Sequence, residues 1–206
     1  MFLKFIIGVI MNSGNYRKYS YKTPIKKLIL AQFGAAMLAI MTSMPTVTLG
    51  DGGRTLEVVT SAIAVFFLLY LQYTAMWDIA AKDRISIDGG RLKEDKLVGL
   101  KSALLASIPT YVITFIAIAL RGIFLLSKAD AIGSVSTITY AADLLWNYMY
   151  HGVLVLFVPS SPNSPLFLAY LATFIALTAP SLITCYIAYN QGLKGKRILP
   201  EKKNNR

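Results

Sequence analysis

Long apolar runs alternate with short charged segments along the chain, and this alternation predicts membrane-spanning helices. Four runs are candidate spans: residues 28–44, 58–77, 102–120 and 165–189. The run at 58–77 contains no charged side chain and ends at Trp77, an aromatic residue typical of the membrane interface. The shortest run, 28–44, reaches roughly 25 Å as a helix, which is near the lower limit for crossing a hydrocarbon core.

These runs predict an all-α fold, namely an integral membrane helical bundle with four transmembrane helices. We expect residues 1–206 to form a single membrane domain. Residues 1–27 are expected to form a basic amphipathic segment on the cytoplasmic face, with a signal peptide as the alternative. A charged loop at 78–101, with short helical extensions or a hairpin around Gly89 and Gly90, and a basic tail at 190–206 complete the cytoplasmic side.

Residues 121–164 are the segment whose path is left open by the sequence. Residues 133–158 are long enough to cross, but Asp143 would then lie near the bilayer centre, and the basic tail would lie outside. We therefore expect an outer-face helix that lies at the interface or re-enters the membrane. Two short half-crossings remain an alternative.

Composition and charge support the same environment. The chain is 55% hydrophobic and 15% charged, with a mean hydropathy of +0.56 that is too high for an ordinary soluble domain. Its net charge is +11, and eighteen of its 21 Lys and Arg residues lie in the segments 1–27, 78–101 and 190–206. The positive-inside rule then predicts a multi-pass protein of the cell membrane with both termini in the cytoplasm. Anionic lipid headgroups, rather than nucleic acid, are the expected partner of this charge.

Candidate chemistry is sparse. The chain has one cysteine, Cys185, and one histidine, His151, so it cannot form an intramolecular disulfide or a zinc site built on a histidine pair. It lacks a nucleophile elbow, a phosphate-binding loop and a dinucleotide fingerprint, so we expect no catalytic, cofactor or metal site. An enzyme would have to assemble its groups from Asp78, Asp83, Asp143 and His151.

The charged loop carries side chains of both signs, unlike the purely basic N-terminal segment. Such a mixture is typical of a solvated face, and it is also suited to docking a cytoplasmic partner by charge complementarity. The candidate docking residues are Asp78, Lys82, Asp83, Arg84, Arg91, Asp95 and Lys96.

Two further residues are candidates for an intramembrane polar pair. Asp143 would need a partner if residues 133–158 re-enter the bilayer, and Arg121 is the nearest basic residue along the sequence. The alternative for Arg121 is an extended side chain at the outer interface.

Small residues recur every four positions in the first and last spans, at Ala31, Ala35 and Ala39 and at Ala172, Ala176, Pro180, Thr184 and Ala188. Such ridges allow close helix contact, so these two spans are expected to pack on each other or between copies in a homo-oligomer. The basic residues that follow Trp77 and Tyr189 at equal spacing also fit two related helical hairpins, although any cytoplasmic exit tends to read this way.

The stretch "WDIAAKDRISIDGGRLKEDKLVGLKSAL", together with the tail "AYNQGLKGKRILPEKK", resembles uncharacterised small membrane proteins of low-GC Gram-positive bacteria. The resemblance implies a membrane location and no known reaction. We therefore expect a non-enzymatic accessory or scaffold subunit that docks a cytoplasmic or membrane partner, with a small oligomeric permease as the alternative.

Overall fold

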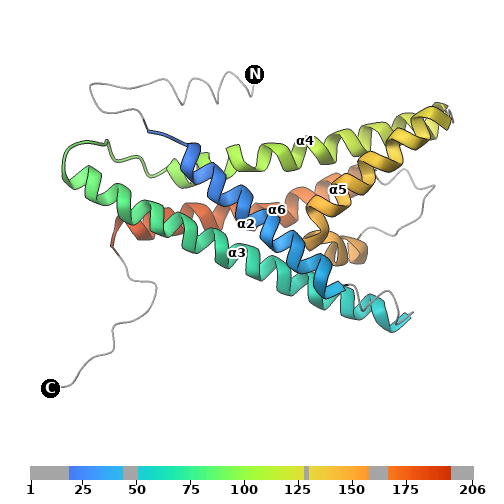
Figure 1. The fold of residues 1–206 in the computed structure, drawn as a ribbon, viewed down its shortest axis with the longest axis horizontal. Helices are drawn as coiled ribbons and strands as arrows, with labels where there is room; N and C mark the ends of the chain where they lie inside the picture. The colour runs from blue at the N-terminus through green and yellow to red at the C-terminus, as the bar shows by residue number, and fades with distance from the viewer. Residues whose placement is uncertain (1–18, 44–50, 128–129, 158–166, 196–206) are drawn as a thin grey trace.

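The computed structural model describes residues 19–43, 51–127, 130–157 and 167–195, and these form five helices (Figure 1). The helices are α2 (Lys22–Ser43), α3 (Asp51–Asp88), α4 (Val98–Ser127), α5 (Asp130–Phe157) and α6 (Phe167–Leu193). The prediction of an all-helical fold is confirmed for the described part of the chain. Most of the predicted N-terminal segment and of the basic tail lies outside the described residues.

Within the residues that the structure describes, three helices are long and apolar enough to cross a membrane. They are α2, residues Thr55–Asp88 of α3, and α4. Large apolar side chains on these helices point away from the bundle, among them Phe66 at 73% exposure and Phe115 at 64%. So much outward apolar surface supports insertion into lipid, as the sequence predicts.

Helices α3 and α4 extend furthest beyond their predicted spans. Helix α3 begins at Asp51, so residues 51–57, which precede the predicted span at 58–77, are helical despite the glycines at 52 and 53. Helix α4 continues through Ser127, so residues 121–127 of the predicted outer segment belong to this helix. The reason is physical: an α-helix satisfies its own backbone hydrogen bonds and need not end where the apolar run ends.

The charged loop (residues 78–101) is largely helical. Helix α3 continues through residues 78–88 and ends where Gly90 adopts a left-handed conformation with φ 69°. The amide of Arg91 donates to the carbonyl of Ser86 over 2.9 Å, which closes the helix end. Asp95 then accepts a 2.9 Å bond from the amide of Leu97 just before α4 begins. The predicted helical extensions around a glycine turn are thus confirmed.

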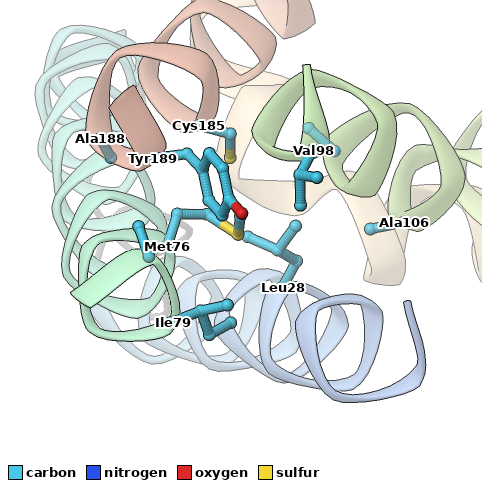
Figure 2. Packing of buried hydrophobic residues seen from close by; sticks show 10 residues of the cluster. Leu28, Met76, Ile79, Val98, Ala106, Cys185, Ala188 and Tyr189 are labelled. Carbon is cyan, nitrogen blue, oxygen red and sulfur yellow. The ribbon is translucent and has the colours of Figure 1, made fainter. Parts of the chain in front are cut away.

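Helix α3 packs most extensively within the described bundle, against α2, α5 and α6. At the end of the bundle that carries the charged loop, Tyr189 of α6 lies among Met76, Leu28 and Val98 of the other helices (Figure 2). Close approach there depends on glycine: a Cβ atom on Gly99 would lie 2.5 Å from the carbonyl oxygen of Cys185.

The predicted small-residue ridges have different outcomes. Ala31, Ala35 and Ala39 are all buried, but α2 uses them mainly against α3 and α5, and it contacts α6 far less. On α6, Ala176 and Pro180 are exposed, and the inward face instead follows Phe174, Thr178, Ser181, Cys185 and Ala188. Within this single chain the buried face of α6 thus follows the 3.6-residue period of the helix rather than a strict repeat of four, and contact of the exposed ridge residues with a second copy stays a prediction.

Helix α5 returns from the far end of α4 toward the middle of the bundle (Figure 1). Its helical geometry is broken at Asn147, where φ is −108° and ψ is 17°. Just beyond this break, the carbonyl of Met149 accepts a 2.5 Å hydrogen bond from Ser61 of α3. The break therefore coincides with a contact between a backbone group of α5 and a side chain of a neighbouring helix.

Candidate functional site

A buried carboxylate lies one helical turn before the break in α5. Asp143 is 1% exposed, and its Oδ1 atom accepts a 2.6 Å bond from the hydroxyl of Thr114 and a 2.8 Å bond from the amide of Asn147. The Asn147 amide also donates to the Thr114 hydroxyl over 3.1 Å. We call these three residues the Asp143 cluster. Burial of a carboxylate is costly without such donors, so its position is defined by both helices.

Local sequence accounts for this geometry. Asp143 and Asn147 are four residues apart, which places them on the same side of one helix. On α4, the inward face repeats every four residues through Ser102, Ala106, Thr110 and Thr114. The other buried residues of α4 are Val98, Gly99, Ala103 and Ala117, so three hydroxyl-bearing side chains lie among small and apolar ones. The α4–α5 interface is thus polar at its centre.

The polar contacts extend from the Asp143 cluster to α2. One turn from Thr114, the hydroxyl of Thr110 accepts hydrogen bonds from the Trp146 indole (2.9 Å) and from the Gln32 amide (2.5 Å). Gln32, Thr110 and Asn147 are all buried. Three helices therefore meet through hydrogen bonds in the interior of the bundle.

A second set of polar contacts lies between α6 and its neighbours. Ser181 donates a 2.5 Å bond to Gln72 of α3, and Thr178 lies 2.6 Å from the Tyr111 hydroxyl of α4. Among the residues that the structure describes, three buried atoms have no hydrogen-bond partner: Ser102 Oγ, Ser136 Oγ and Asn147 Oδ1. The last of these belongs to the Asp143 cluster, which leaves it one acceptor for a further donor.

The two residues of the predicted intramembrane pair lie in the same region. Arg121 lies about two helical turns after Thr114, the α4 residue that donates to Asp143, and its guanidinium lies 5.9 Å from the centre of the Phe124 ring. Their direct pairing stays a prediction. Sequence reasoning missed Thr114 and Asn147 as neighbours of Asp143, although the Asp-x-x-x-Asn spacing was a signal for one of them.

Asp78, the first candidate docking residue, is engaged within the chain. Its Oδ2 atom lies 2.7 Å from the ammonium of Lys27 on α2 and 2.9 Å from that of Lys82. Hydrogen bonds from these two lysines hold the pKa of the Asp78 carboxyl below its usual range. Asp78 therefore links the beginning of α2 to α3.

Asp83 lies in a different environment. Its Oδ2 atom accepts hydrogen bonds from the hydroxyls of Tyr19 (2.9 Å) and Tyr189 (3.0 Å), and the carboxyl is half-buried. Burial raises its pKa above the usual range, and the two tyrosine hydrogen bonds offset only part of this effect. Asp83 thus joins the segment before α2 to the end of α6.

The remaining docking candidates lie around the same end of the bundle. Arg84 pairs loosely with Asp88 at 3.6 Å, and Asp95 pairs with Lys101 at 2.6 Å. The carbonyl of Lys96 accepts a 3.3 Å bond from Asn190 of α6. Arg91 and Lys82 line a cavity of about 410 Å³. All seven residues therefore lie at one end of the bundle, and the three carboxylates among them bind partners within the chain.

Near the opposite end, His151 of α5 meets Glu57 of α3. The Nδ1 atom of His151 lies 2.8 Å from Glu57 Oε1, and its ring stacks on Tyr148 with centroids 5.5 Å apart. This contact fastens α5 to α3 beyond the break. Within the described residues, no group of three or more His, Cys, Asp or Glu side chains is placed to hold a metal ion.

Comparisons with known proteins add no relative: no family model, curated protein or solved structure matches the chain.

Proposed function

We propose that the chain crosses the cell membrane four times, through α2, α3, α4 and α6, with α5 as a re-entrant helix and both termini in the cytoplasm. The position of the charges supports this arrangement. The beginning of α2, the end of α3, the beginning of α4 and the end of α6 share one end of the bundle (Figure 1). The described parts of the three basic segments therefore face one side, as the positive-inside rule requires of a cytoplasmic face.

We further propose that the protein is a small permease that carries protons or a monovalent cation through a site at Asp143. The observation that carries this proposal is the burial of Asp143 beside a broken helix. Ionisable groups in the interior of membrane bundles mark ion and proton pathways, and broken helices form binding sites in many transporters.

The surrounding groups suit such a role. Thr114 and Asn147 hold the carboxylate by donating to one oxygen, Oδ1. A bound proton or cation would neutralise the charge that burial disfavours. The carboxylate would then alternate between a charged form held by these donors and a neutral form. The polar contacts of Thr110 and Gln32 continue from this site toward α2.

Reconstitution into liposomes tests the proposal. The purified full chain is expected to conduct protons, sodium or potassium above the level of empty liposomes, measured with a pH-sensitive dye and with radiolabelled cations. Asp143→Asn should abolish this flux, whereas the matched variant Asp88→Asn, which changes an exposed carboxylate at the other end of the bundle, should preserve it. Flux equal to that of empty liposomes, or equal flux in wild type and Asp143→Asn, would overturn the proposal.

The second candidate is an accessory or scaffold subunit, which the gathering of exposed cations at one end of the bundle favours. Lys82, Arg84, Arg91 and Lys96 are all exposed there. Affinity purification of the full chain from mild detergent should then retain a second protein that Arg84→Glu and Lys96→Glu together release. Recovery of only the chain itself would count against this function.

A further inference from the structure

The charged end of the bundle contains a cavity whose lining has a distinct chemistry. The cavity has a volume of about 410 Å³ and lies between the beginning of α2 and the end of α3. Three cationic side chains line it, Lys27, Lys82 and Arg91, against one carboxylate, Asp83. A volume of this size accommodates a small ligand or a lipid headgroup.

The two lysine side chains of the lining are held in place by ion pairs with a neighbouring carboxylate. Asp78, which does not line the cavity, lies within 2.9 Å of both lysine ammoniums. The same carboxylate therefore holds the two ammoniums side by side, at a separation that one anionic group can bridge. Arg91 adds a planar guanidinium, the group best matched to the oxygens of a phosphate.

The single carboxylate in the lining is hydrogen-bonded to tyrosine hydroxyls. Asp83 accepts hydrogen bonds from Tyr19 and Tyr189 on one oxygen, so this oxygen is engaged within the chain. The hydroxyls of Ser20, Thr23 and Ser86 also line the cavity and add possible donors to an anion. Three cations with hydroxyl donors form a typical phosphate-binding set.

The position of the cavity suits a ligand at the membrane surface. Lys27 lies one residue before the first apolar run, and Lys82 lies five residues after Trp77 at the end of the second. Ile79, Pro24 and Leu92 supply apolar lining. Apolar and cationic groups are thus combined at the level where lipid headgroups reside.

From this arrangement we propose that the cavity binds the phosphate group of an anionic ligand, either a glycerophospholipid headgroup or a soluble phosphate compound. The site is separate from Asp143 and independent of the proposed transport. It gives the basic charge of this face a defined binding position, with Lys82 and Arg91 as the principal contacts and Lys27 as the third.

Two binding measurements on the full chain test the site and separate the two sources. The first is native mass spectrometry of detergent-purified protein incubated with phosphatidylglycerol or phosphatidylcholine. The second is saturation binding of radiolabelled inorganic phosphate. The test variant is Lys82→Gln with Arg91→Gln. The matched control is Lys93→Gln with Lys96→Gln, which removes the same charge from the same loop outside the cavity.

We expect the test variant to bind the phosphate-bearing ligand about a hundredfold or more weakly, because each of its two lost charge-assisted contacts contributes about a factor of ten or more. The control variant should bind like wild type, and both should keep the wild-type midpoint of thermal unfolding. Selective loss of phosphatidylglycerol alone identifies a lipid site, and selective loss of inorganic phosphate identifies a soluble ligand. Equal loss in both variants, or no saturable binding of either probe, would overturn the proposal.

Discussion

Asp78 and Asp83 lie five residues apart on α3 and show how strongly tertiary neighbours determine the chemistry of a side chain. Two lysines stabilise the charged form of Asp78, whereas Asp83 is half-buried and accepts hydrogen bonds from two tyrosine hydroxyls. Their pKa values are displaced in opposite directions. Replacement of each by asparagine should therefore affect stability with opposite dependence on pH.

For Asp83→Asn we expect equal or higher thermal stability than wild type at neutral pH. Because the pKa of Asp83 is raised in the folded state, the wild type loses stability as pH rises from about 4, the unfolded value, through the folded pKa. Asparagine keeps an oxygen acceptor for both tyrosines and has no charge to bury. Unfolding midpoints in detergent between pH 4 and 7 should fall less steeply in the variant, and a steeper fall would contradict this assignment.

For Asp78→Asn we expect a loss of stability at neutral pH of less than about 1 kcal/mol, since the carboxylate is 41% exposed and solvent screens the pairs. The pKa of Asp78 is lowered, so its contribution is present above about pH 4 and disappears as pH falls through the folded value. The two proteins should converge in thermal midpoint at low pH. A difference that persists below pH 3 would argue against the lysine pairs as its cause.

Sequence reasoning at the residue scale found Asp143 but not its hydrogen-bond donors. Asp143 was visible because a charged residue is rare in an apolar segment. Thr114 lies 29 residues away, and nothing in its own helix distinguishes it from Thr110 or Ser107 before α5 is placed. The inward orientation of Asp78 and Asp83 was likewise invisible, because their partners Lys27, Tyr19 and Tyr189 come from distant parts of the chain.

At the scale of helices, apolar length predicted the elements well and predicted their ends poorly. Hydropathy located α2, α3 and α4 because burial in lipid requires apolar side chains along a whole span. It did not locate the beginning of α3, where residues 51–57 are helical, and the end at Asp88 was indicated by the glycines that follow rather than by hydropathy. The hydropathy pattern also could not predict which helices pack together, because the small alanine side chains of α2 fit equally well against any neighbouring helix.

The glycines of α2 and α4 offer a matched test of helix packing. A Cβ atom on Gly99 would lie 2.5 Å from the Cys185 carbonyl oxygen and 2.7 Å from Tyr189 Cβ, whereas one on Gly34 would have no neighbour within 4 Å. We expect Gly99→Ala to destabilise the bundle by about 1–3 kcal/mol, because α4 and α6 must move apart. Gly34→Ala should be neutral or stabilising by up to about 1 kcal/mol through helix propensity. The measurement is the midpoint of thermal unfolding of each variant in detergent. Equal effects of the two substitutions would show that α4 and α6 are not in close contact at Gly99.

At the scale of the molecule, the charged loop and the far end of α4 should lie on opposite sides of the membrane. In a Cys185→Ala background, Leu126→Cys should react with an impermeant maleimide on intact cells, since this side chain is 89% exposed at the end of α4. Lys93→Cys should react only after permeabilisation. Labelling of Lys93→Cys on intact cells would reverse the proposed orientation, and equal labelling of both would contradict a membrane-spanning α4.

The order in which the helices contact one another bears on how the protein is made. In the described part of the chain, α3 and α4 are consecutive but share almost no direct contact, and α6 packs against both. A ribosome delivers α6 last, so a growing polypeptide has α3 and α4 in the membrane before the helix that joins them exists. Until α6 is inserted, Gln72 of α3 lacks its donor Ser181, and Tyr111 of α4 lacks its partner Thr178. Premature termination before residue 167 should therefore leave an unclosed assembly that cellular quality control recognises and degrades.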